Sequence, residues 1–167
     1  MEKKIILIVE DDPNVGESIR LLLKKRGFSI LLASNGKEAL HLFRKENVDL
    51  VITDLVMPKM DGIELLEAVK TLRPETEVIV ISAQGTIEKA VQAMKLGAFE
   101  FIVGYVDIMY SSDPDDPDDP DDPDMSDGAL LWVRSHVGEA SGKRYWHGDF
   151  LYRNIICDWL ARRRRAA

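Results

Sequence analysis

The amino-acid sequence predicts an α/β domain with a parallel, doubly wound sheet over roughly its first hundred residues. Between Lys4 and Val103, short runs rich in Ile, Val and Leu alternate with longer amphipathic stretches. Strands buried on both faces have this composition, and crossover helices supply the amphipathic segments. Acidic residues also follow two of the apolar runs directly, where strands of such a sheet end. These observations together predict five strands in one helix-covered sheet.

Each expected element can be placed from its pattern. The strands are Lys4–Val9, Phe28–Ala33, Asp49–Thr53, Glu77–Ile81 and Glu100–Val103. The helices between them are indicated by apolar residues at helical spacing, namely Val15, Ile19, Leu22 and Leu23, then Ala39, Leu40 and Phe43, then Ile63, Leu66 and Val69, and finally Ile87, Val91 and Met94. A fifth helix is expected after the fifth strand, but the sequence there carries no pattern for one.

Residues 104–125 differ in character from the domain before them. An atypical segment is followed by four copies of Asp-Pro-Asp between Asp113 and Asp124. Because proline removes main-chain donors and aspartates repel one another, we expect an extended linker, with a calcium-binding or partner-binding acidic arm as the alternative. Without these eight aspartates the net charge of −7 would be about +1, so the acidity belongs to the linker.

Residues 126–167 form a tail that its pattern assigns to no fold. Within it, residues 149–165 carry Leu151, Ile155 and Trp159 at helical spacing and end in four arginines. This segment is a candidate surrogate for the fifth helix. The arginines could instead contact nucleic-acid phosphates, but a solvated helix end is the expected role, so we expect no DNA binding.

The composition indicates a cytoplasmic protein. The longest apolar runs, such as Ile5–Val9, are far shorter than the ~18 residues that a membrane-spanning helix needs. Acidic residues follow that run at once, unlike the flank of a secretory signal. The single cysteine, Cys157, cannot form an internal disulfide, which agrees with a reducing compartment.

Three acids at the ends of two expected strands suggest a metal site. Glu10 and Asp11 follow the first strand, and Asp54 follows the third. In a doubly wound sheet of order 2-1-3-4-5 these strands are neighbours, so the three carboxylates share one crevice. Like charges this close are costly unless a cation joins them, and hard oxygen ligands suit Mg²⁺. The alternative is that such acids only cap the following helices, as we expect of Asp12.

Four motifs lie at the ends of the expected strands, in an order and spacing that agree across residues 1–103. They are Ile-Leu-Ile-Val-Glu10-Asp11-Asp12, Ile-Thr-Asp54-Leu-Val-Met57-Pro58-Lys-Met-Asp-Gly62, Ile-Ser82-Ala83 and Gly97-Ala-Phe-Glu-Phe101. Together they resemble the receiver domain of two-component response regulators, and the stretch from Gly85 to Gly97 is most similar to the NtrC-like subgroup. The resemblance implies a flavodoxin-like fold.

The resemblance also implies roles for residues of the acidic site. Asp54 would be the phosphoacceptor and the modified residue, with Asp11 and the Val56 main-chain carbonyl as direct Mg²⁺ ligands. Glu10 would reach the metal through water. Such a metal would offset the charge between a carboxylate nucleophile and an anionic phosphoryl donor.

Two further residues match the family's switch. Ser82 would hydrogen-bond the phosphoryl group, with the small Ala83 leaving it room, and Phe101 would turn inward as Ser82 moves. The family's lysine at the end of the fifth strand is replaced by Gly104. This removes a charge-assisted contact of ~1.5–3 kcal/mol, so transmission is expected to be impaired more than phosphorylation.

The function implied by the resemblance is that of a phosphorelay receiver. It would accept a phosphoryl group from a sensor histidine kinase, a phosphotransfer protein or a small donor, and hydrolyse it slowly, without being a conventional enzyme. Its output would pass through an unidentified protein partner, and a homodimer is compatible with the resemblance. The alternative is a receiver-like binding module with impaired phosphorylation.

Overall fold

The computed structural model describes residues 3–103, 105–109, 130–134, 146–147 and 155–165. Its chain divides into two compact units, Met1–Gly104 and Tyr105–Ala167, which are described separately below. The boundary coincides with the change in sequence character after Val103.

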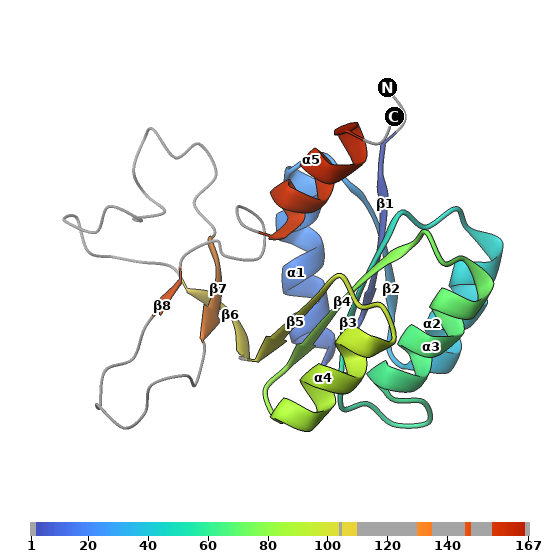
Figure 1. Cartoon of the computed structure of the whole chain (residues 1–167). Coiled ribbons are helices and arrows are strands. Elements are labelled where there is room, and N and C mark those ends of the chain that lie inside the picture. Colours follow the sequence, from blue (N-terminus) through green and yellow to red (C-terminus); the bar gives the residue numbers. More distant parts are fainter. Residues whose placement is uncertain (1–2, 104, 110–129, 135–145, 148–154, 166–167) are drawn as a thin grey trace, which may run out of the picture. The chain divides into compact units, whose positions relative to one another are not determined.

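The first unit is a five-stranded parallel sheet of order β2-β1-β3-β4-β5. Figure 1 shows the sheet with α1 on one face and α2 and α3 on the other. This confirms the predicted fold. The strands are β1 (Ile5–Val9), β2 (Ser29–Ala33), β3 (Leu50–Asp54), β4 (Glu77–Ser82) and β5 (Glu100–Val103), and the helices are α1 (Pro13–Lys25), α2 (Gly36–Lys45), α3 (Gly62–Leu72) and α4 (Ile87–Lys95).

The core lies where the three central strands meet the helices. The side chains of β1, β3 and β4 are almost completely buried, as their apolar composition predicts, and α2 and α3 add Ala39, Phe43, Leu65, Leu66 and Val69. Strands buried on both faces fix the sheet order firmly, because a shifted strand would expose apolar side chains. The central strands therefore hold the ends of β1 and β3 side by side.

Polar side chains fix where the helices begin. Asp12 caps α1 by accepting a hydrogen bond from the Asn14 amide at 2.8 Å, as expected from the sequence. At α3, Asp61 and Glu64 form a reciprocal capping box, with distances of 2.8 and 3.0 Å. These caps end the loops after β1 and β3 at defined residues, which matters because the loops carry the acidic site.

The side chain of Arg73, at the end of α3, reaches the end of α2. Its guanidinium lies 4.3 Å from the centre of the Phe43 ring, donates to the Glu46 carbonyl oxygen at 3.1 Å, and also donates to the Phe43 carbonyl oxygen. These oxygens belong to the last turn of α2, where carbonyls lack helical partners. Arg73 thus joins the C-terminal ends of two helices.

Helix α4 forms where predicted, but the apolar residues that predicted it do not face the core. Ile87 is 81% exposed, and Val91 and Met94 are about half exposed. Ala93 is the residue of α4 that is buried. The helix lies next to β5, the edge strand of the sheet, and packs through a small residue, so its larger apolar side chains stay in solvent.

The described residues that follow β5 form a strand, β6 (Tyr105–Met109), instead of the family's fifth helix. It pairs antiparallel with β7 (Leu130–Arg134), which pairs with β8 (Trp146–His147). These strands were not among those expected from the sequence. The Asp-Pro-Asp linker lies outside the described residues.

Helix α5 (Cys157–Arg165) lies within the expected range of 149–165. Residues 149–154 are outside the described ones. The helix carries an ion pair between Asp158 and Arg162 at 2.8 Å. Its role as a surrogate for the fifth helix stays a prediction. Among the helices that the structure describes, none has the length and apolar character to cross a membrane.

Candidate functional site

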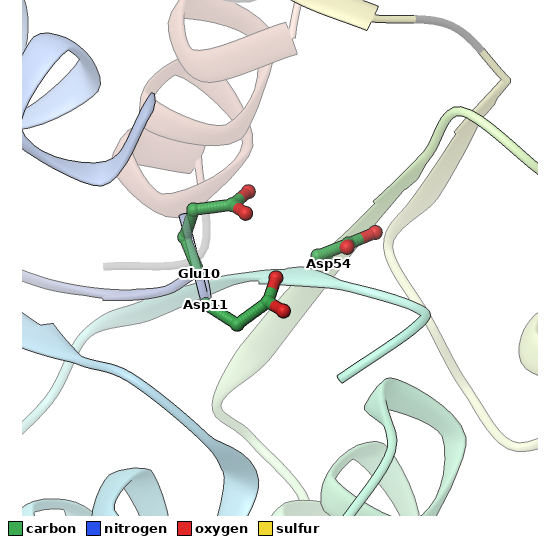
Figure 2. A group of neighbouring side chains, drawn as sticks. All are labelled: Glu10, Asp11 and Asp54. Atoms are coloured by element: carbon green, nitrogen blue, oxygen red, sulfur yellow. The ribbon is translucent and has the colours of Figure 1, made fainter. Parts of the chain in front are cut away.

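The acidic site lies at the C-terminal ends of β1 and β3. Glu10 and Asp11 follow β1, Asp54 is the last residue of β3, and the strands pair at Val9 and Thr53. One carboxylate oxygen from each of the three acids lies within 4.8 Å of the others. Figure 2 shows the three side chains as neighbours. The structure thus gathers the acids that the sequence singled out.

Burial and mutual repulsion disfavour the ionised form of these carboxylates. Burial, together with the charges of Asp54 and Asp11, raises the pKa of Glu10 to about 7, against a hydrogen bond from the Asp12 amide that lowers it. Burial also raises the pKa of Asp54, although amide hydrogen bonds from Leu55 and Val56 oppose the shift. An ion pair or a bound cation would relieve this cost, and within the described part of the chain no cationic side chain contributes to either shift.

The donor set fits a hard divalent cation. Three carboxylates converge, Asp11 is exposed, and Glu10 and Asp54 are only half-buried, so water can complete a coordination sphere. Val56, whose carbonyl the family resemblance adds as a ligand, lies in the loop after β3 with its side chain about half exposed. Mg²⁺ keeps several waters when it binds carboxylates, which an open site of this kind allows.

The loop after β3 is held close to Asp54 by main-chain packing. The Gly62 amide donates to the Leu55 carbonyl oxygen at 2.9 Å. A Cβ atom on Gly62 would overlap the Asp54 carbonyl oxygen and lie 2.9 Å from the Leu55 Cα, so only glycine fits. The buried Thr53 hydroxyl donates to the same Asp54 carbonyl oxygen at 2.9 Å. Two neighbours therefore fix the backbone of Asp54.

These positioning roles of Thr53 and Gly62 were not indicated by the sequence pattern. Gly62 stood inside the motif around Asp54, but its contact with the Asp54 carbonyl oxygen is made through the folded loop. Thr53 read only as the polar end of an apolar strand. A glycine shortly after a strand-end acid was the one signal in the sequence that could have pointed to a tight loop.

Ser82 and Phe101 lie on the two strands beyond β3. Ser82 ends β4, is almost fully buried, and its Oγ accepts a hydrogen bond from the Gln84 amide at 3.1 Å. Phe101 lies on β5, paired with Val80 of β4, and is half-buried against the core. Gly104 is outside the described residues. The acids at the ends of β1 and β3 and the two switch candidates on β4 and β5 thus lie on four adjacent strands of the sheet.

The comparison with protein families agrees with this geometry. The family model described as the response regulator receiver domain matches residues 6–108. The chain belongs to this family. The receiver domain is also 39% identical over 102 residues to the transcriptional regulatory protein GlrR of Escherichia coli. That match covers 61% of this chain and 23% of GlrR, so the chain spans about a quarter of that relative's length.

Solved structures of similar receivers show the same fold. The response regulator TrrA of Thermotoga maritima, in complex with Mg²⁺ and BeF, has a TM-score of 0.56 and 32% identity, covering 61% of this chain and 87% of TrrA. A response regulator of Burkholderia pseudomallei with a phosphorylated aspartic acid and a calcium ion has a TM-score of 0.58 and 28% identity, covering 60% of this chain and 59% of that one.

Proposed function

We propose that this receiver accepts a phosphoryl group on Asp54 in a Mg²⁺-dependent reaction and serves in a two-component phosphorelay. The observation that carries the proposal is the convergence of three carboxylate oxygens within 4.8 Å at the ends of β1 and β3. Membership of the receiver family supports it. Structures of similar receivers that contain Mg²⁺ with BeF, or a phosphorylated aspartic acid, support the same chemistry.

In the transfer step, an Asp54 carboxylate oxygen attacks the phosphorus atom of the donor. The new oxygen–phosphorus bond forms as the bond to the donor's leaving atom breaks, and the leaving group keeps that electron pair. Glu10, Asp11, Asp54 and the Val56 carbonyl would hold Mg²⁺, which offsets charge between the carboxylate and the phosphoryl oxygens. Among the residues that the structure describes, no cationic side chain contributes to the pKa shift of Glu10 or Asp54.

The chain's own residues hold the nucleophile in place. The Leu55 amide donates to Asp54 Oδ1 at 2.6 Å, and the Val56 amide also donates to this carboxylate, so two main-chain amides orient it. Thr53 and Gly62 fix the main chain on either side of the Asp54 carbonyl. Ser82 supplies a hydroxyl that can leave the Gln84 amide and donate to a phosphoryl oxygen. These contacts orient the Asp54 carboxylate and leave the site open to a phosphoryl donor.

A mass measurement tests the proposal directly. The full chain, incubated with acetyl phosphate and Mg²⁺, is expected to gain about 80 Da as an acid-stable, base-labile adduct. Asp54→Asn, which preserves shape but removes the nucleophilic carboxylate, should gain none. Asp49→Asn is a matched control, because Asp49 is an aspartate at the opposite end of β3, where it accepts from Lys4. Absence of the adduct in the wild-type chain would refute the proposal.

The phosphodonor follows from the same chemistry. We expect a sensor histidine kinase or a phosphotransfer protein to supply the phosphoryl group, with small donors acting in vitro. GlrR is named as a transcriptional regulatory protein. Our expectation that the present chain does not bind DNA stays a prediction. Salt-sensitive DNA binding that is lost when arginines 162–165 are replaced would contradict it.

A further inference from the structure

The loop between β3 and α3 contains a strained turn. Among the described residues, Lys59 is the one non-glycine residue with a positive φ, at 72°. The Met60 amide donates to the Pro58 carbonyl oxygen at 2.9 Å, which closes a three-residue γ-turn around Lys59. A γ-turn whose central residue has a positive φ is rare and strained, and a residue other than glycine keeps such a conformation only where its surroundings hold it. The neighbours of this turn therefore decide the shape of the loop.

The start of α2 contacts the turn through Gly36. This glycine is the first residue of α2 and is buried. A Cβ atom on Gly36 would lie 2.8 Å from the Cβ, the Cγ and the carbonyl oxygen of Met60, whereas carbon atoms pack favourably at about 3.5–4.0 Å. The φ of Gly36 is outside the left-handed region, where Gly27 and Gly97 lie. Position 36 therefore needs glycine for the close approach of Met60, because its backbone conformation would suit other residues.

A second contact between α2 and the turn is electrostatic. Glu38 accepts hydrogen bonds from the Ser34 amide at 2.8 Å and from the Ser34 hydroxyl at 2.7 Å. These hydrogen bonds lower the pKa of Glu38, and the positive charge of Lys59 lowers it further. Because both side chains are exposed, their attraction is weak. The packing of Met60 on Gly36 is thus the stronger of the two contacts.

The turn belongs to the loop that carries one of the expected metal ligands. This loop includes Val56, whose carbonyl would hold Mg²⁺ together with the three acids. Its first part is anchored by the buried side chains of Leu55 and Met57, and its end by the capping box of α3. The contact between Gly36 and Met60 lies between these anchors. Because the loop is short and held at both ends, a displacement of Met60 is passed along its main chain to Val56.

We propose that Gly36 is a positioning residue of the metal site. By letting Met60 pack against the start of α2, it holds the strained turn at Lys59 and, with it, the loop that carries the Val56 carbonyl. This inference rests on the proposed function, because the loop would complete the Mg²⁺ site. Gly36 acts through the main chain of the loop and supplies no ligand of its own. A side chain at position 36 should therefore weaken Mg²⁺ binding while every ligand is retained.

A titration of the full, unphosphorylated chain with MgCl₂, followed by amide chemical shifts in NMR spectra, tests this proposal. Before metal is added, Gly36→Ala is expected to shift the amide resonances of residues 55–61. It should then raise the Mg²⁺ dissociation constant about tenfold, at the lower end of the effect of removing a group that orients a metal ligand. Lys37→Ala is the matched control, at an exposed position in the same turn of α2, and should leave both measurements unchanged.

A second variant shows whether the strained turn is the link between α2 and the metal site. Glycine adopts a positive φ without strain, so Lys59→Gly lets the loop adjust around a new methyl group at position 36. In that background, Gly36→Ala should raise the dissociation constant only about threefold, a non-additive effect. If Gly36→Ala alone does not fold, adding Lys59→Gly should restore folding, and a failure to restore it would overturn the proposal.

Urea unfolding without metal separates positioning from packing alone. If Gly36→Ala lowers stability but leaves the Mg²⁺ dissociation constant unchanged, the glycine only packs, and the proposal is overturned. Tenfold changes in both backgrounds, or the same change in Lys37→Ala, would also overturn it. A wild-type chain whose resonances do not respond to MgCl₂ would instead refute the proposed function, while the metal-free spectra of Gly36→Ala would still test the support of the loop.

Discussion

Gly62, the first residue of α3, and Gly85, in the loop after β4, follow neighbouring strands of the sheet, yet they face different kinds of atom. Gly62 lies against the main chain of Asp54 and Leu55, whereas Gly85 lies against the ends of the Phe101 and Val103 side chains. Main-chain atoms within a sheet cannot move without breaking hydrogen bonds, but a side chain can change rotamer. The part of the site around Asp54 is held in place by main-chain atoms, and we call it the fixed half. The other half, around Ser82, is bounded by the ends of side chains, which can change rotamer.

Gly62→Ala should disrupt the fixed half and cause the largest loss of stability. The new methyl group would collide with the Asp54 carbonyl oxygen and the Leu55 Cα, so we expect the free energy of unfolding to fall by about 3 kcal/mol or more. Urea denaturation would measure it. Gly85→Ala is the matched control and should lose about 1 kcal/mol or less, since only the ends of the Phe101 and Val103 side chains must move. Equal losses in the two variants would remove the distinction between the halves.

Glu10→Gln should reveal how much the buried Glu10 carboxylate destabilises the fixed half when it is ionised. Because the folded-state pKa of Glu10 is raised to about 7 from an ordinary 4.5, the folded chain holds a proton between these pH values that the unfolded chain has lost. Stability without metal should therefore fall as pH rises from about 5 to about 7, and then level off. Glu10→Gln should remove much of this slope.

The same substitution should stabilise the metal-free chain at pH 8 by about 1–2 kcal/mol, a value lowered from the full pKa shift because part of the side chain stays in water. Thermal unfolding across pH, with and without Mg²⁺, provides the measurement. Glu17→Gln is a control at an exposed glutamate whose pKa is lowered by Arg20. A stability of the wild-type chain that rises between pH 5 and pH 7, or an unchanged slope in Glu10→Gln, would contradict the expectation.

Thr53→Val should cause the smallest loss of stability, and it tests whether the two halves of the site respond separately. Valine keeps the shape of threonine but cannot donate to the Asp54 carbonyl oxygen, so a loss of about 1 kcal/mol is expected. In NMR spectra of the chain labelled with ¹³C in its phenylalanine rings, the Phe101 resonances should be unchanged before phosphorylation, because Thr53 belongs to the fixed half. Thr53→Ser, which keeps the hydroxyl, distinguishes the hydrogen bond from packing. A shifted Phe101 resonance in Thr53→Val would show that the halves are not separate.

Much of the fold could be predicted because each strand and helix has a recognisable pattern within its own short segment of sequence. Strands β1, β3 and β4 are buried on both faces, so they appear in the sequence as continuous apolar runs, and their ends differ from the prediction by at most a residue or two. The acidic site followed from that order, since residues after neighbouring parallel strands meet at one edge. Glu10, Asp11 and Asp54 could therefore be brought together from sequence alone.

What escaped prediction depends on contacts between distant segments. The apolar pattern of Ile87, Val91 and Met94 gave the right helix and the wrong face, because the pattern does not say that a helix at the sheet edge packs through Ala93. Strand β6 was missed because its partner β7 lies beyond the Asp-Pro-Asp linker. The steric roles of Gly62 and Gly85 exist only when loop and neighbour are folded together.

The contact that Arg73 makes with the end of α2 bears on how the domain opens. Its guanidinium occupies the carbonyl oxygens of Phe43 and Glu46 and stacks on the Phe43 ring, so the last turn of α2 cannot fray while α3 keeps its own end. Helices linked in this way lose their structure together. The face of the sheet that α2 and α3 cover should behave as one cooperative unit of local unfolding, with α4, which exposes its apolar side chains, among the segments that open more easily.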